Sequence, residues 1–75
     1  MVRVYVITDG YAAQDVAAEL VCLAEERGGE VFSRLNGVRA LFKYESEGVS
    51  FREAVLSNRL LKGKLAGLSF TNEEN

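Results

Sequence analysis

The Asn36-Gly37 dipeptide, which separates two stretches of alternating apolar residues, constrains the fold more than any other feature of this sequence. A type I′ turn needs a positive φ angle at both central residues, and Asn-Gly is the pair that adopts it most readily. The sequence therefore predicts a β-hairpin formed by residues 30–35 and 38–44. In the register that this turn sets, Arg34 lies opposite Arg39, so that two like charges face each other across the strands.

Two helical stretches and two further strands surround this hairpin. Residues 2–8 alternate, with valines on one face, and residues 12–27 place apolar side chains at helical spacing. Asp9 is expected to cap the first helix, and Ser50 and Glu53 form a capping box for a second. The expected order is strand 2–8, helix 12–27, strands 30–35 and 38–44, helix 50–62 and strand 65–71.

This order of elements, within 75 residues, predicts an α+β fold of the ferredoxin-like βαββαβ type. Right-handed crossovers place both helices on one side of a four-stranded antiparallel sheet, which leaves the other face of the sheet open. A chain of this length has room for one hydrophobic core. We therefore expect a single domain over residues 1–71 and a polar C-terminal tail over residues 72–75.

Composition restricts the chemistry that the chain can perform. It contains no His and a single Cys, and its formal net charge is −2. His is the commonest general base and metal ligand, and a single Cys excludes an internal disulfide. We therefore expect a protein that is not an enzyme and holds no metal or cofactor. No stretch approaches the ~20 apolar residues of a membrane helix, so we expect a cytoplasmic protein.

The open face of the expected sheet combines aromatic and basic side chains. Acidic residues predominate in residues 1–30, whereas basic residues predominate in residues 31–64. Single-stranded nucleic acids are bound by aromatic planes that stack on bases and by cations that contact phosphates. The alternative is a solvated face on which long basic side chains cover the aromatic rings. The candidate residues are Tyr5 and Phe32 for stacking and Arg3, Arg34, Arg39 and Lys43 for phosphate or base contacts.

Two of the expected strands resemble those of a known family, the RNA-recognition motif. Val4-Tyr5-Val6 is similar to the aliphatic–aromatic–aliphatic triplet of its first strand, and residues 38–44 resemble its third-strand motif. Arg39 and Leu41 stand where the family has two outward-facing aromatic residues that stack on bases. The resemblance implies a ferredoxin-like fold and binding of single-stranded RNA on the sheet. The third-strand residues that match the family are Ala40, Phe42 and Tyr44.

The outer faces of the two helices suggest a different function. At 100° per residue, Ala18 and Cys22 lie on the outer side of the first helix. Leu56 and Leu60 are four residues apart and point away from the expected core of the second helix. Alternatively, a distorted last turn of that helix would rotate Leu60 inward. Together these side chains would form a contiguous apolar patch, which usually marks a contact with another chain. The alternative function is therefore a protein-interaction or homodimerisation module.

A third reading is a regulatory domain that binds a small ligand. Ferredoxin-like domains of that type use a glycine-rich turn together with a partner chain. Here only Asp9-Gly10 resembles such a turn.

Overall fold

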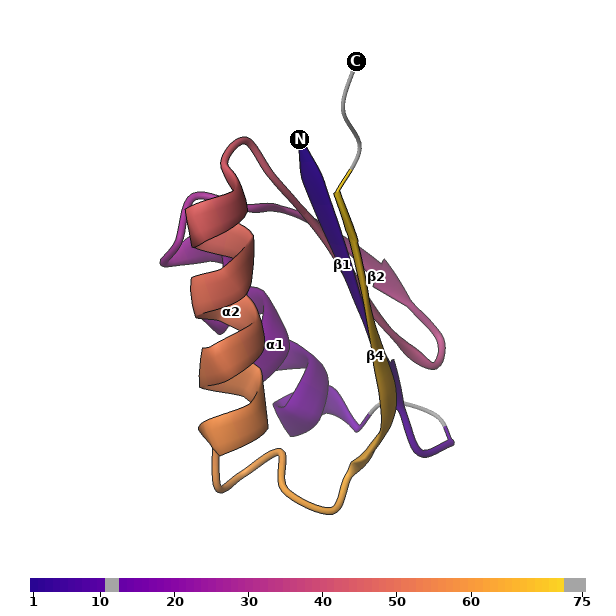
Figure 1. Cartoon of the computed structure of the whole chain (residues 1–75). Coiled ribbons are helices and arrows are strands. Elements are labelled where there is room, and N and C mark those ends of the chain that lie inside the picture. Colours follow the sequence, from indigo (N-terminus) through magenta and orange to yellow (C-terminus); the bar gives the residue numbers. More distant parts are fainter. Residues whose placement is uncertain (11–12, 73–75) are drawn as a thin grey trace.

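The computed structural model describes residues 1–10 and 13–72. In chain order its elements are β1 (Val2–Thr8), α1 (Gln14–Glu25), β2 (Glu30–Arg34), β3 (Gly37–Phe42), α2 (Glu45–Ser57) and β4 (Leu65–Asn72) (Figure 1). The βαββαβ order predicted from the sequence is confirmed. Strand β4 includes Asn72, which the prediction assigned to the tail, and residues 73–75 of that tail lie outside the described residues.

The strands form one antiparallel sheet in the order β2-β3-β1-β4, with β1 and β3 in the centre. Both helices lie on the same side of this sheet (Figure 1). Helix α1 packs on β2 and β3, and α2 packs on β1, β3 and β4. None of the described elements covers the opposite face. This arrangement is the ferredoxin-like sandwich that the order of elements predicts.

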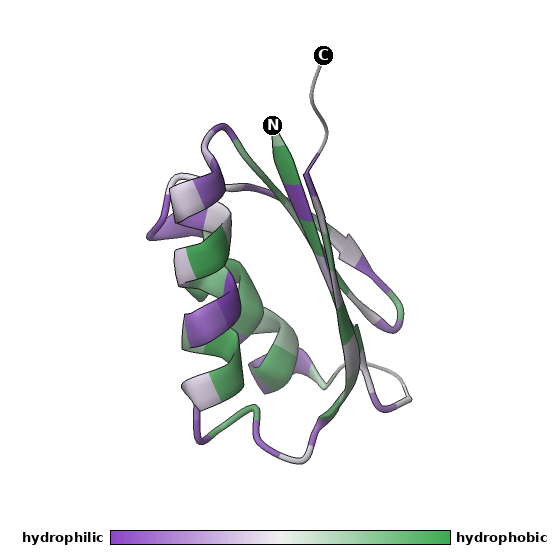
Figure 2. Ribbon diagram, viewed as in Figure 1, coloured by the Kyte–Doolittle hydropathy of each residue, from purple (hydrophilic) through white to green (hydrophobic). Residues whose placement is uncertain are grey.

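The core lies between the sheet and the helices, where apolar residues face one another (Figure 2). Burial of a Val, Leu or Phe side chain in this core stabilises the fold by about 1.5–3 kcal/mol. The rings of Phe42 and Phe51 join β3 to α2, with 5.3 Å between their centroids. Leu35 and Tyr44 follow the same alternation but are 78% and 62% exposed, because each lies just beyond the end of a strand. The buried apolar residues are Val2, Val4, Val6, Val16, Leu20, Ala24, Val38, Ala40, Phe42, Phe51, Val55 and Leu61.

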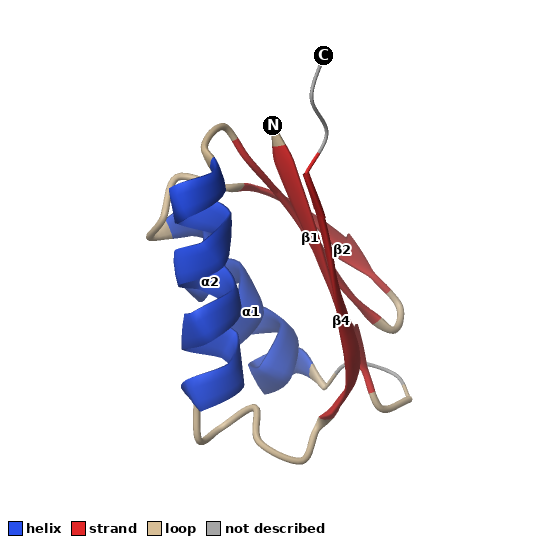
Figure 3. Cartoon of the chain, in the orientation of Figure 1, coloured by secondary structure: helices blue, strands red, loops and turns tan. Residues whose placement is uncertain are grey.

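The hairpin turns one position earlier than the sequence predicts. Its loop, the tan turn that follows β2 in Figure 3, consists of residues 35–36. Arg34 therefore pairs with Gly37, and Arg39 pairs with Phe32. The predicted pairing of Arg34 with Arg39 is therefore wrong. Among the described residues, positive φ angles occur only at glycines outside this hairpin, so the turn is not of type I′. Because the pairing changes by two residues, each side chain keeps its predicted face.

Close packing explains why Gly37 belongs to β3 rather than to the turn. A Cβ atom at Gly37 would overlap the carbonyl oxygen of Val6 and would lie 3.0 Å from Cε1 of Tyr5. The missing side chain lets the Tyr5 ring lie against β3. Gly37 is thus required by a contact between strands, which its neighbours in the sequence do not reveal.

Both helices begin at positions that differ from the prediction. Ala13 stands at the N-cap of α1 without a side-chain hydrogen bond, and Asp9 is exposed, so the predicted cap by Asp9 is wrong. Helix α2 begins at Glu45, well before Ser50. Glu47 Oε1 accepts a hydrogen bond of 3.2 Å from the backbone N–H of the residue just before this helix. The acidic residue that caps α2 is therefore six residues upstream of Glu53, the acidic residue of the predicted capping box.

Helix α2 also ends earlier than predicted, at Ser57. Asn58 Oδ1 accepts hydrogen bonds from the backbone N–H groups of Leu60, at 2.9 Å, and Leu61, at 3.3 Å. These bonds replace the helical pattern and turn Leu61 into the core. Leu56 and Leu60 consequently do not share one helix face. Neither helix of the described residues is long and apolar enough to cross a membrane.

Candidate functional site

The open face of the sheet is organised as rows of side chains that run across all the strands. Cross-strand pairing places Ser69 of β4, Tyr5 of β1, Arg39 of β3 and Phe32 of β2 in one central row. Aromatic side chains therefore lie on both sides of a central guanidinium group. The row beside it contains Thr71, Arg3, Leu41 and Glu30, and the row on its other side contains Gly67, Ile7, Gly37 and Arg34.

Arg39 is held against its neighbours. Its guanidinium carbon lies 5.2 Å from the centroid of the Phe32 ring, which is cation–π distance. Its Nε atom is buried and has no hydrogen-bond partner among the described residues. An unpaired buried donor is destabilising by ~1–3 kcal/mol. Arg39 therefore places a positive group beside the Phe32 ring and leaves one donor unsatisfied.

Tyr5 lies on the other side of Arg39 and is half-buried. Its ring lies close to Gly37, and its hydroxyl donates a long hydrogen bond of 3.5 Å to Oδ1 of Asn36 in the turn. The neighbouring glycine and this contact orient the ring along the sheet. An aromatic ring fixed in this way is a suitable platform for stacking.

A hollow of about 400 Å³ lies on this face between β1, β3 and β4. It brings together two guanidinium groups and three hydroxyl groups, and none of the described residues that line it carries a carboxylate. Such a set of donors suits an anion such as a phosphate, because charge-assisted hydrogen bonds are the strong ones. The lining residues are Arg3, Tyr5, Arg39, Ser69 and Thr71.

The remaining predicted sheet residues lie around this hollow rather than in it. Phe32 is 42% exposed at the end of the central row. Arg34 is exposed at the end of β2, opposite the first residue of β3, and Lys43 is exposed just beyond the other end of β3. Lys43 lines a smaller hollow of about 260 Å³ together with Glu30, which carries the opposite charge. The structure thus gathers Arg3, Tyr5 and Arg39 and leaves the two outer cations at the margin.

Sequence reasoning missed Ser69 and Thr71, which supply hydroxyl groups to the hollow. The signal for them was present, because Leu68 and Phe70 pack against the core and the residues between and beyond them must face the other way. Both are cross-strand neighbours of predicted residues, Ser69 of Tyr5 and Thr71 of Arg3.

The predicted apolar patch on the helices is divided between the two edges of the sheet. Ala18 and Cys22 line a groove beside Ser33 of β2, and this groove has a volume of about 680 Å³. On α2, Arg52 lies over the Phe70 ring of β4, at 4.7 Å from its centroid. Leu56 follows Arg52 by one helical turn and is therefore on that same flank. Since β2 and β4 are the opposite edges of the sheet, the patch expected from helical projection does not form.

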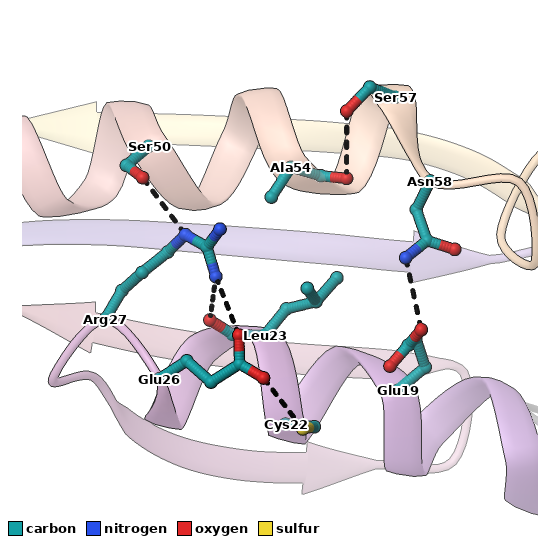
Figure 4. A network of polar contacts seen from close by, with 9 residues as sticks. All are labelled: Glu19, Cys22, Leu23, Glu26, Arg27, Ser50, Ala54, Ser57 and Asn58. Atoms are coloured by element: carbon teal, nitrogen blue, oxygen red, sulfur yellow. Dashed lines mark hydrogen bonds and ion pairs between the residues drawn. The ribbon is translucent and has the colours of Figure 1, made fainter.

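Polar side chains occupy the space between the helices instead (Figure 4). Arg27 Nε donates to Ser50 Oγ at 3.0 Å, and Arg27 Nη1 donates to the carbonyl oxygen of Leu23 at 2.9 Å. Asn58 Nδ2 donates to Glu19 Oε2 at 3.1 Å. These contacts join the segment just after α1 to α2, and the middle of α1 to the residue that follows α2. They fix which side of each helix meets the other, and so which side of α1 faces β2.

Cys22 lies on the side of α1 that faces away from α2 (Figure 4). Its Sγ donates a hydrogen bond of 3.3 Å to Glu26 Oε1. This bond and the charge of the Glu26 carboxylate raise the pKa of the Cys22 thiol above its usual range, and Glu19 and Glu25 add to the effect. A thiol held in its protonated form is a poor nucleophile.

The described residues contain no group of three or more His, Cys, Asp or Glu side chains placed to bind a metal ion. Comparison with known proteins gave no match of this chain to a protein family, to a curated protein or to a solved structure.

Proposed function

We propose that this chain is a non-enzymatic module that binds single-stranded RNA on the open face of its sheet. The observation that carries the proposal is the central row, in which Arg39 lies between Tyr5 and Phe32. Beside this row, Arg3 and Arg39 line the same hollow, which is the anion-binding chemistry that a nucleic-acid backbone requires. The resemblance of β1 and β3 to the RNA-recognition motif supports the same face.

The side chains of the central row are of the types that bind single strands by stacking on their bases. Base–aromatic stacking contributes about 1–3 kcal/mol per base, and it tolerates any sequence because every base has a π face. Tyr5 and Phe32 provide such surfaces, and the guanidinium plane of Arg39 can stack on a base as well. The RNA-recognition motif has two stacking aromatic residues on its third strand, where this chain has Arg39 and Leu41. The planes of Tyr5, Phe32 and Arg39 compensate for those two residues.

Hydroxyl groups favour RNA over DNA as the ligand. Ser69 and Thr71 lie beside the basic side chains of the hollow. The ribose 2′-OH both donates and accepts hydrogen bonds, and it is the group by which a protein distinguishes RNA from DNA. Ser and Thr hydroxyls are suitable partners because they also donate and accept. The net charge of −2 opposes the approach of a polyanion, so we expect weak binding that is strengthened at low salt.

The test is fluorescence anisotropy of a labelled uridine-rich RNA oligomer at low salt, with DNA of the same sequence for comparison. Removing one stacking ring by Tyr5→Ala should weaken binding by about 1–3 kcal/mol, which is roughly 5- to 150-fold. Tyr44→Ala is the matched control, because Tyr44 is an exposed tyrosine outside the sheet. Equal losses in both variants, or no binding by the wild type, would contradict the proposal.

The alternative of a protein-interaction module that uses the outer helical face finds less support. Its four residues, Ala18, Cys22, Leu56 and Leu60, are not gathered into one surface.

A further inference from the structure

Strand β2 is an edge of the sheet. The strand order β2-β3-β1-β4 pairs it on one side only, with β3. The backbone groups on its outer side form a row that can pair with a further strand, and natural proteins usually protect such rows. No described element lies on this side of β2 in the strand order.

The sequence of β2 is complementary to itself. Its residues are Glu-Val-Phe-Ser-Arg, from Glu30 to Arg34, with Phe32 at the centre. In an antiparallel pair with a two-fold axis at Phe32, Glu30 lies opposite Arg34 of the copy, and Arg34 lies opposite its Glu30. Opposite charges placed directly across strands stabilise an antiparallel pair, and two aromatic rings at the centre do the same. Both charged side chains and Phe32 are exposed in the single chain.

The groove beside β2 provides a second complementary surface. It lies between α1 and the edge strand, and half of its lining residues are small: Ala17, Ala18 and Cys22 of α1 and Ser33 of β2. An antiparallel β2 pair brings α1 of the copy alongside this groove, because α1 packs on β2 in each chain. Small residues allow such a close approach of two helices.

The same symmetry avoids a clash of acidic residues along this groove. Helix α1 runs antiparallel to β2, to which a short connection joins it. The two-fold axis therefore sets the C-terminal end of one α1, with Glu25 and Glu26, beside the N-terminal end of the other, with Gln14. Leu35, which is 78% exposed just after β2, comes to lie beside the chain of the copy that precedes its β2.

We propose that a second copy of this chain pairs with the first along β2, antiparallel and with the two-fold axis at Phe32. The charge pattern of the strand, its unpaired edge and the adjoining groove all favour a second copy over an unrelated partner. The pairing leaves the open face uncovered and places the central rows of both chains end to end. It joins the two sheets into one surface, but it does not depend on RNA binding and can be tested without RNA.

Charge reversal provides the first test, with dissociation constants measured by sedimentation equilibrium. Glu30→Arg and Arg34→Glu each turn two attractive cross-strand pairs into repulsive ones, so each variant should dimerise roughly tenfold more weakly than the wild type. Mixing the two variants restores every attraction, so native mass spectrometry should find the heterodimer in excess over both homodimers. Glu53→Arg, an exposed reversal on α2, is the matched control and should leave dimerisation unchanged.

Cross-linking provides a second test that does not depend on charge. Residues directly opposite in an antiparallel pair have Cα atoms about 4.5–5.5 Å apart, which lies within the range for a disulfide. Phe32→Cys in a Cys22→Ser background should therefore form a disulfide-linked dimer in air, whereas Ser69→Cys in the same background should not. Circular dichroism verifies the fold of each variant. A wild type that remains monomeric at about 1 mM, no preference for the mixed dimer, or no cross-link at position 32 would overturn the proposal.

Discussion

The two faces of the sheet are built from the same strands, yet the side chains of one face pack in the core whereas those of the other face remain accessible. On the face covered by the helices, Val2, Val4 and Val6 of β1 are at most 1% exposed and pack in the core. On the open face, Arg3 and Tyr5 alternate with them and remain half-buried. A period of two residues thus separates the side chains that hold the fold together from those available to a ligand.

This separation has a practical consequence for mutagenesis. The only buried polar or charged residue among the described ones is Thr8, whereas the open face holds several basic side chains around one hollow. Substitutions on the covered face should therefore change mainly the free energy of unfolding. Substitutions on the open face should change mainly the affinity for RNA.

The largest expected effect compares two phenylalanines, one on each face. Phe42 is fully buried and contacts Phe51, so Phe42→Ala should lower the free energy of unfolding by about 3–5 kcal/mol. Phe32 is 42% exposed, and Phe32→Ala should lower it by less than ~1 kcal/mol. Urea denaturation followed by circular dichroism measures both. Similar losses for the two variants would remove the distinction between the faces.

Gly37 and Gly67 lie in the same row of the open face, with Ile7 between them, and provide a finer comparison. A Cβ at Gly37 would overlap the Val6 carbonyl oxygen, so Gly37→Ala should destabilise by about 1–3 kcal/mol and displace the Tyr5 ring. At Gly67, on the same row, a Cβ would meet no atom within 4 Å. Gly67→Ala should therefore be neutral or stabilise by up to ~1 kcal/mol. Urea denaturation measures the stability of both variants. If Gly37→Ala were as stable as Gly67→Ala, the packing role of Gly37 would be refuted.

The cations of the open face should affect the salt dependence of RNA binding rather than stability. Each phosphate contact on a single strand contributes about 0.7 to the slope of log K against log salt concentration. Arg3→Gln and Arg39→Gln should each lower this slope by about that amount. Arg59→Gln, at an exposed position after α2, should leave it unchanged. RNA titrations at several salt concentrations measure this slope for each variant. An unchanged slope in Arg39→Gln would show that Arg39 does not contact a phosphate.

The smallest effect concerns the helix layer, where the structure indicates an unreactive thiol. Because Glu26 raises the pKa of Cys22, less thiolate is present at pH 8 than in an ordinary cysteine peptide. Alkylation by iodoacetamide should therefore be slower for the protein than for the peptide. Glu26→Gln lowers the pKa and should accelerate the reaction, whereas Glu53→Gln should not. An unchanged rate in Glu26→Gln would show that the hydrogen bond from Cys22 does not control its reactivity.

The fold was largely predictable from the sequence because alternation and helical spacing are local signals. The errors arose where a residue serves a distant contact. Asn36-Gly37 has the composition of a type I′ turn, but Gly37 is needed against Val6 in another strand. Ser50 and Glu53 have capping-box spacing, yet α2 begins earlier and Ser50 instead accepts a hydrogen bond from Arg27.

The candidate site was predictable only in part, for a similar reason. Alternation places Arg3, Tyr5 and Arg39 on the open face whatever the register. That Arg39 lies beside Phe32 rather than Arg34 depends on the register of the hairpin. The rotation of the helices about their axes was not predictable, because it is fixed by contacts between them, such as that of Asn58 with Glu19.

The central claim is that single-stranded RNA binds on the open face of the sheet, and backbone NMR shift mapping tests it most directly. On titration with the RNA oligomer at low salt, we predict shifts that concentrate at Tyr5, Phe32, Arg39, Ser69 and Thr71. The outward residues of the helices, such as Cys22 and Leu56, should remain unchanged. A titration without shifts on the open face, or with shifts confined to α1 and α2, would contradict the account.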